Sequence, residues 1–254
     1  MSAVAKSSSS LALASRTEQS VAVLTAEGLL DAKNSAELRD TITKATLDVP
    51  SAVIVDVSAL QVPDDASWSA FVSARWQLDT RPDVPIVLVS SNRATREAIT
   101  RSGVAQFMPV YPTEKGALKG VAKLGRRKLQ HAQAKLPANL TSLRESRQLV
   151  REWLTTWSKP GLIPVALVVV NVFIENVLEH TGSDPVMRIE CEGQTATIAV
   201  SDSSSAPALR LTSPSKGIDV SGLAIVEALS RAWGSTPTSS GKTVWAVIGP
   251  ENQL

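Results

Sequence analysis

Apolar and polar residues follow two alternating patterns in the first half of the chain. Short apolar runs predict buried strands at 21–28, 51–58 and 84–90, and a further short strand at 106–110. Amphipathic segments predict helices at 33–46, 64–78, 93–103 and 113–129. Strands that alternate with helices favour an α/β fold, in which helices pack against a sheet.

The second half has a different order of elements. Two long helices come first, at 141–157 and within the apolar stretch "GLIPVALVVVNVFIENVLEH". Two strands, a polar Ser/Pro/Gly-rich segment, a helix and a last strand follow, at 186–193, 195–202, 203–217, 221–233 and 242–248. This order predicts an α+β layer, and the polar segment predicts a mobile loop.

The two patterns divide the chain into two domains. The predicted organisation is a disordered start at 1–9, a first domain at 10–129, a basic linker at 130–136 and a second domain at 137–250. The expected fold class is therefore an α/β protein of two domains.

Composition narrows the class of protein. Hydrophobic residues make up 43% of the chain and charged residues 20%, as in a soluble globular protein. The single cysteine, Cys191, fits a reducing compartment, and the two histidines lie too far apart in sequence to suggest a zinc or Ser-His-Asp site. The longest apolar run, 162–174, is shorter than the roughly 20 residues of a membrane span. We therefore expect a cytoplasmic protein without a membrane segment.

Positive charge is concentrated in one window. Residues 115–151 contain ten lysines and arginines and one acid, Glu145, so the window carries +9 and the rest of the chain −7. A solvated helix face with a linker is one interpretation, and a docking surface for an acidic partner is another. The window has no interleaved aromatic residues, which argues against direct nucleic-acid binding.

Polar residues interrupt the second long helix near its end. Asn171, Glu175, Asn176, Glu179 and His180 follow the nearly continuous aliphatic stretch 161–170. An amide buried in an apolar helix costs about 1 kcal/mol or more unless it is paired. Either the helix reaches the surface here or Asn176 faces a pocket.

Several motifs resemble known families. In the second half, "LPANLTSLRESRQLVREWLTTW", "NVFIENVLEHT", "IAVSDSSSAP", "SGLAIVEALSRAWG" and "GKTVWAVI" resemble the GHKL (Bergerat-fold) ATP-binding domain of bacterial anti-sigma-factor serine kinases, over roughly 135–248. In the first half, "GLLDAKNSAELR", "VIVDVSALQVPDDAS", "VPIVLVSS" and "SGVAQFMPVYPT" are similar to a STAS domain, the fold of anti-sigma-factor antagonists, over roughly 10–125. The resemblance implies a STAS-type sheet with helices, followed by a GHKL α+β sandwich of helices layered on a mixed sheet.

The resemblance also implies a set of nucleotide-site residues. Asn176 matches the asparagine that completes the coordination of magnesium on the ATP phosphates, and Asp202 matches the aspartate that accepts a hydrogen bond from the adenine amino group. Ser204 stands where glycine is usual, Gly222 matches a glycine beside the phosphates, and Thr243 matches a hydroxyl beside the adenine. Each also has an ordinary alternative, as a helix, turn, cap or strand residue.

Three positions depart from the pattern. The catalytic base expected four residues before Asn176 is Val172, which cannot accept a proton. The glycine-rich lid motif reads Val220-Ser221-Gly222. The phospho-acceptor position of the STAS half is Asp65, which has no hydroxyl, although it can also be only part of an acidic helix start.

These features favour a regulator that acts by protein binding in a sigma-factor partner-switching pathway. Its partners would be a sigma factor, an anti-sigma factor or a STAS-domain protein. Its two halves could also dock on each other, or two copies of the chain could form a homodimer. The alternatives are an active anti-sigma-factor serine/threonine kinase, with Glu179 as a replacement base, and a nucleotide-binding sensor without turnover.

Overall fold

The computed structural model describes residues 10–18, 20–47, 50–76, 84–124, 129–204, 222–238 and 240–252, with the side chains of all of these except Asp65 and Ala66. The chain divides into two compact units, Met1–Arg126 and Arg127–Leu254.

The first unit is built on a five-stranded mixed sheet in the order β1-β2-β3-β4-β5. The strands are β1 (Ala12–Glu18), β2 (Val21–Leu29), β3 (Ala52–Gln61), β4 (Ile86–Val89) and β5 (Val110–Tyr111). β1 pairs with β2 in antiparallel fashion, whereas β2, β3, β4 and β5 run parallel to their neighbours. Parallel strands need crossover connections, and helices provide them here.

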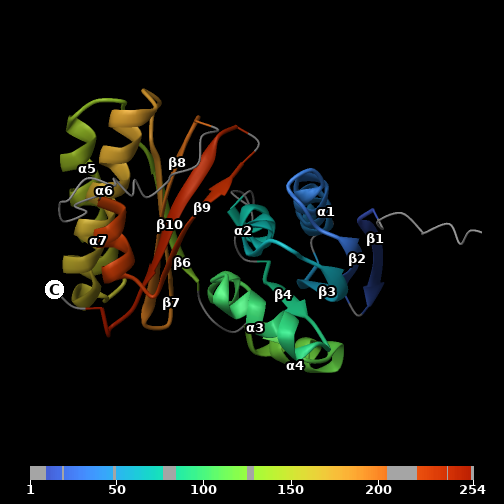
Figure 1. Ribbon diagram of the computed structural model, residues 1–254. Helices are drawn as coiled ribbons and strands as arrows, with labels where there is room; N and C mark the ends of the chain where they lie inside the picture. The colour runs from blue at the N-terminus through green and yellow to red at the C-terminus, as the bar shows by residue number, and fades with distance from the viewer. Residues whose placement is uncertain are drawn as a thin grey trace, which may run out of the picture. The chain divides into compact units, whose positions relative to one another are not determined.

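Helices cover both faces of this sheet (Figure 1). They are α1 (Ser35–Leu47), α2 (Ser69–Trp76), α3 (Arg93–Arg101) and α4 (Glu114–Leu124), with 3₁₀ turns η1 (Asp65–Trp68) and η2 (Val104–Gln106). Figure 1 shows α1 and α2 on one side and α3 and α4 on the other. On the second side, Ala117 and Val121 of α4 pack on buried valines and isoleucines of β2, β3 and β4. The α/β fold expected for this half is confirmed.

The second unit has a five-stranded antiparallel sheet in the order β6-β7-β8-β10-β9. The strands are β6 (Gln130–Lys135), β7 (Val186–Glu192), β8 (Thr195–Asp202), β9 (Ala232–Pro237) and β10 (Lys242–Ile248). The helices α5 (Thr141–Thr156), α6 (Ile163–His180) and α7 (Gly222–Leu229) lie together on one face of the sheet (Figure 1). This arrangement is the α+β layer predicted for the second half.

The helix α6 is the centre of the second core. Its residues Val169, Phe173 and Val177 are buried against apolar side chains of β7, β8 and β10. Together with the preceding 3₁₀ turn η3 (Pro160–Leu162) it forms the one described helix, Pro160–His180, that is long and apolar enough to cross a membrane, with a mean hydropathy of 2.1. The side of α6 that faces the sheet is buried in the second core, and 50% of the apolar window is buried in this way.

The predicted basic linker at 130–136 is wrong. Residues 130–135 form β6, which pairs along its whole length with β7, and Leu136 is buried after it. The division between the units falls earlier, between Arg126 and Arg127. The strand was missed because an edge strand needs few apolar residues: three β6 residues pair with core residues of β7, and they are Gln130, Ala132 and Ala134, two alanines and a polar amide.

Other differences lie at element boundaries. The helix predicted at 221–233 ends at Leu229, and β9 follows it. The short strand predicted at 106–110 is shifted to Val110–Tyr111, and β1 was not predicted. The predicted disordered start at 1–9, most of the predicted loop at 203–217, and Val220 and Ser221 of the lid motif lie outside the described residues.

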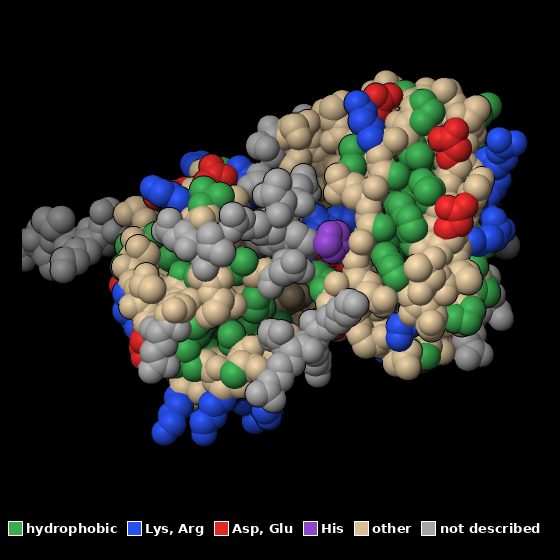
Figure 2. All heavy atoms as spheres, turned by 180° about the vertical axis from the view of Figure 1, so that it is seen from behind, with side chains coloured by type: hydrophobic (Ala, Val, Ile, Leu, Met, Phe, Trp, Pro, Cys, Tyr) green, Lys and Arg blue, Asp and Glu red, His purple; other side chains and the backbone are tan. Residues whose placement is uncertain are grey.

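The basic window at 115–151 does not form one element. Lys115, Lys119 and Lys123 lie on α4 in the first unit, whereas three arginines lie on α5 in the second unit, at 144, 147 and 151. Figure 2 shows Lys and Arg side chains in separate groups on the visible face rather than in one continuous band. The charge window is therefore divided between the two units.

Cys191 provides a test of the second core. The thiol is 1% exposed, and burial raises its pKa to about 11, so it stays protonated near neutral pH. We expect a thiol reagent such as DTNB to react far more slowly with the native chain at pH 8 than with the chain in denaturant, where one thiol per chain should react. Equally rapid reaction in both conditions would contradict this packing.

Candidate functional site

Two of the polar residues in α6 link it to α5. Arg147 of α5 donates a hydrogen bond from Nη1 to Oδ1 of Asn171 (3.0 Å), and Nδ2 of Asn171 donates to Oε1 of Glu175 (2.7 Å). The chain of donors and acceptors satisfies the Asn171 amide on the side of α6 that faces α5. These two polar residues therefore have a structural role, and the helix does reach a polar environment there.

Val172 faces a different neighbour. It is 7% exposed and belongs to the second core. A Cβ placed on Gly222, the first residue of α7, would lie 2.7 Å from Cγ1 of Val172, which is closer than real Cβ atoms come to other atoms. The absence of a side chain on Gly222 thus allows the start of α7 to approach α6. Val172 fills this space, at the position where the family resemblance predicts a catalytic base.

Asn176 lies one helical turn after Val172, on the same face of α6. Its Nδ2 atom is buried and has no hydrogen-bond partner among the described residues. Glu179, three residues further on, is on the last turn, where its side chain is 70% exposed and lies 4.0 Å from His180. The exposed position of Glu179 gives no support for its use as a replacement base.

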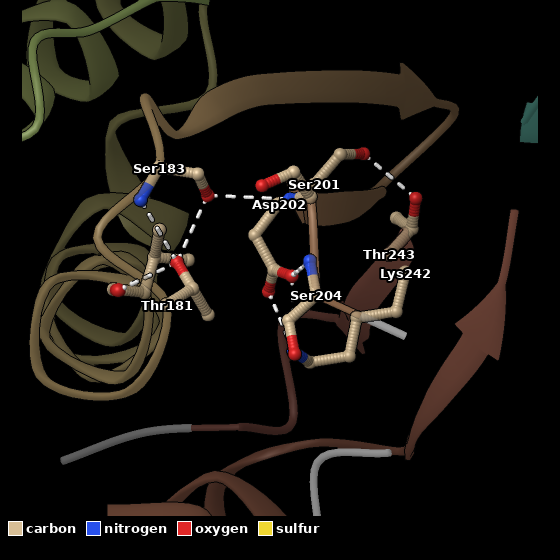
Figure 3. A network of polar contacts seen from close by, with 9 residues as sticks. Thr181, Ser183, Ser201, Asp202, Ser204, Lys242 and Thr243 are labelled. Atoms are coloured by element: carbon tan, nitrogen blue, oxygen red, sulfur yellow. Dashed lines mark hydrogen bonds and ion pairs between the residues drawn. The ribbon is translucent and has the colours of Figure 1, made fainter. Parts of the chain in front are cut away.

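Asp202 ends β8 with a nearly inaccessible carboxylate. The side chain is 2% exposed, and Nζ of Lys242 lies 3.0 Å from Oδ1 and 2.9 Å from Oδ2. The backbone N–H of Ser204 also donates to Oδ1, at 2.7 Å. Asp202 and Lys242 are direct cross-strand partners in the β8–β10 ladder, so the sheet register itself places them together (Figure 3).

Hydroxyl groups surround this ion pair (Figure 3). Ser201 Oγ and Thr243 Oγ1, also cross-strand partners, are 2.7 Å apart. Thr181, just after α6, contacts Ser183 through a 2.9 Å hydroxyl pair, and Ser183 Oγ accepts a hydrogen bond from the backbone of Ser203 (3.2 Å). The network fixes the end of β8 to β10 on one side and to the end of α6 on the other.

The predicted site residues therefore fall into two groups. Asp202 and Ser204 are joined at the end of β8, and Thr243 pairs with Ser201 at the neighbouring end of β10. Asn176 lies on the face of α6 that carries Val172, and Gly222 at the start of α7 approaches Val172. Within the described ranges, no three His, Cys, Asp or Glu residues gather to hold a metal ion. The magnesium role of Asn176 stays a prediction.

The resemblance assigns Asp202 to the adenine amino group, and in the structure both carboxylate oxygens already accept from Lys242, and Oδ1 also from the backbone of Ser204. The Thr243 hydroxyl is paired with Ser201. The adenine role of these residues stays a prediction. Lys242 was not among the predicted site residues. Aligning "TATIAVSD" with "KTVWAVI" as antiparallel neighbours would have revealed it, because that pairing sets opposite charges face to face.

The helix start in the first unit carries the position at which the resemblance predicts a phospho-acceptor. Asp65 begins η1, and its side chain lies outside the described part of the structure. Ser67 is 9% exposed, and its backbone N–H donates to the carbonyl of Asp64 (2.9 Å). The hydroxyl nearest in sequence after Asp65 is thus a buried one.

Comparison with known proteins identifies the first unit. Residues 12–117 match the family model of the STAS domain. No curated protein matches the chain.

Solved structures similar to part of the chain include an anti-sigma factor antagonist from Mycobacterium paratuberculosis. The two sequences are 24% identical, the match covers 44% of this chain and 95% of that chain, and the TM-score is 0.39. The unphosphorylated form of the anti-sigma factor antagonist SpoIIAA has 18% identity, with 45% and 97% covered and a TM-score of 0.36. The RsbU and RsbW domains of a Mycobacterium tuberculosis protein have 20% identity, with 47% and 32% covered and a TM-score of 0.36. By its matching family model and its mixed sheet with helices on both faces, the segment 12–117 of this chain is a STAS domain.

Proposed function

We propose that this protein is a cytoplasmic regulator in a sigma-factor partner-switching pathway, and that it acts by binding proteins rather than by transferring phosphate. The observation that carries the proposal is the STAS domain at 12–117, because the proteins of similar structure include anti-sigma factor antagonists. The partner would be an anti-sigma factor, a sigma factor or another STAS-domain protein. The second unit would be a degenerate relative of the GHKL kinases that adds a second binding surface.

The packing of α6 supports the absence of catalysis. A kinase of this class would need a proton acceptor near Asn176, and the side chain one turn before Asn176 is the apolar Val172, held against Gly222. Aliphatic carbon cannot take the proton of an attacking hydroxyl. Glu179 is exposed at the end of the helix, where it meets solvent and His180.

A binding panel tests the proposal. The purified full-length chain is immobilised and exposed in turn to each sigma factor, anti-sigma kinase and STAS protein encoded in its own genome. We expect one of these classes to bind with a dissociation constant in the micromolar range or tighter, as typical specific complexes do, with no change on adding ATP and magnesium. No binding by any of them, or incorporation of radiolabel from ATP into a STAS partner, would refute the proposal.

The acceptor position gives a second prediction. Incubated with an active anti-sigma kinase and ATP, the wild-type chain should take up no phosphate at 64–67, because Asp65 has no hydroxyl and Ser67 is buried. Asp65→Ser should take up phosphate at position 65, and Asp64→Ser is the matched control that shifts the hydroxyl by one residue. Peptide mass mapping reads the result. A phosphate on Ser67 of the wild type would contradict the prediction, because it would show that this helix start can still be phosphorylated.

A further inference from the structure

The Asp202–Lys242 pair is unlike the surface ion pairs of this protein. Both side chains are inaccessible, at 2% and 9% exposure, whereas pairs such as Arg93–Glu97 are largely exposed. One ammonium lies within 3.0 Å of both carboxylate oxygens, so a further donor to Asp202 would have to share oxygens that already accept from Lys242 and, at Oδ1, from the backbone of Ser204. Forming an ion pair in a buried place requires the desolvation of two charges, which is unfavourable, and the pairing of two strands does not by itself need such a pair.

We propose that the ion pair with the Lys242 ammonium prevents the Asp202 carboxylate from accepting a hydrogen bond from the amino group of a purine base. The inference rests on the proposed function, in which the second unit works without a nucleotide, and it assigns that property to a specific side chain. A base amino group is a neutral donor, whereas the ammonium donates a charge-assisted hydrogen bond and neutralises the carboxylate. A nucleotide would therefore have to displace the stronger donor.

Displacement is opposed further by the surroundings of the pair. A displaced Lys242 would leave its ammonium in a buried position, and an unpaired buried charge is strongly unfavourable. The next cross-strand pair, Thr243 and Ser201, projects to the opposite face of the sheet, so its hydroxyls are not positioned to receive a displaced ammonium. The cross-strand register keeps Lys242 opposite Asp202 as long as β8 and β10 remain paired.

Removing the ammonium should therefore open Asp202 to a base. Lys242→Met keeps most of the aliphatic stem and removes the charge, and Lys242→Ser leaves room for water beside the carboxylate if the first variant does not fold. ATP and ITP with magnesium are the probes, because inosine carries no amino group. The full-length wild type and variants are titrated by calorimetry, and thermal unfolding verifies that each variant is folded.

We expect the folded variant to bind ATP at least about tenfold more tightly than the wild type does, and to prefer ATP over ITP by a similar factor, as for a hydrogen bond to a charged acceptor. Lys242→Met combined with Asp202→Asn should lose both effects. The proposal is overturned if a folded variant gains no ATP binding, if it binds ATP and ITP equally, or if the wild type already matches it. Failure of the proposed function would appear separately, as an absence of protein partners in the binding panel.

Discussion

Gly222→Ala should destabilise the second unit by about 1–2 kcal/mol, although the same change in a helix normally stabilises it. In the interior of a helix alanine is favoured over glycine by about 0.5–1 kcal/mol, and at the first residue of α7 any such gain is at most of this size. Here the new methyl group would come within 2.7 Å of Cγ1 of Val172, and overpacking of a core costs about 1–3 kcal/mol. The cost of overpacking is the larger of the two, so the substitution should lower the free energy of unfolding. Denaturant unfolding followed by circular dichroism measures the difference.

The partner of the clash provides the control. Val172→Ala removes the two methyl groups that Gly222 approaches, so the double variant should be more stable than the two single effects predict, by about 1 kcal/mol or more. Gly161→Ala is a matched substitution elsewhere, because a Cβ there would meet no atom within 4 Å. A neutral Gly222→Ala, or strictly additive effects in the cycle, would mean that α7 does not approach α6 this closely.

The sequence predicted central elements better than edges. β2, β3, β7, β8 and β10 lie inside their sheets, where both neighbours are strands, and their apolar runs mark them clearly. The missed or misplaced strands, β1, β5, β6 and β9, all lie at sheet edges. An edge strand has one strand neighbour and much exposed surface, so its sequence carries few apolar residues; "ALASRTE" of β1 and "QHAQAK" of β6 are examples.

The sequence predicted individual residues of the candidate site but not the contacts between them. Motif order pointed to Asp202 and Thr243, which lie at the neighbouring ends of β8 and β10, where Asp202 pairs with Lys242 and Thr243 with Ser201. It gave no indication of Lys242, because the identity of a cross-strand partner depends on register and not on a local motif. The contact between Val172 and Gly222 joins positions 50 residues apart in the sequence, and only the packing of α7 on α6 reveals it.

The same contact bears on whether a kinase could be restored by two substitutions. Val172→Glu would place a carboxylate one turn before Asn176, where a base is expected, and Asp65→Ser would supply an acceptor hydroxyl. A general base contributes about 10²–10⁴-fold to a rate, which a radiolabel assay detects easily. However, position 172 is 7% exposed and contacts Gly222, so the longer charged side chain has neither space nor solvation there.

We therefore expect Val172→Glu to lower the free energy of unfolding by about 3–5 kcal/mol, the usual consequence of an uncompensated buried charge. Transfer from ATP to position 65 in the Val172→Glu, Asp65→Ser variant should stay at least 100-fold below that of a working kinase of this class, since a base contributes little without a positioned nucleotide. Val172→Gln with Asp65→Ser is the matched control, because it has nearly the same shape without a proton acceptor. If the glutamate variant labels position 65 strongly and the glutamine variant does not, then α6 tolerates a base beside α7, Lys242 does not exclude ATP, and the non-catalytic function proposed for the second unit is wrong.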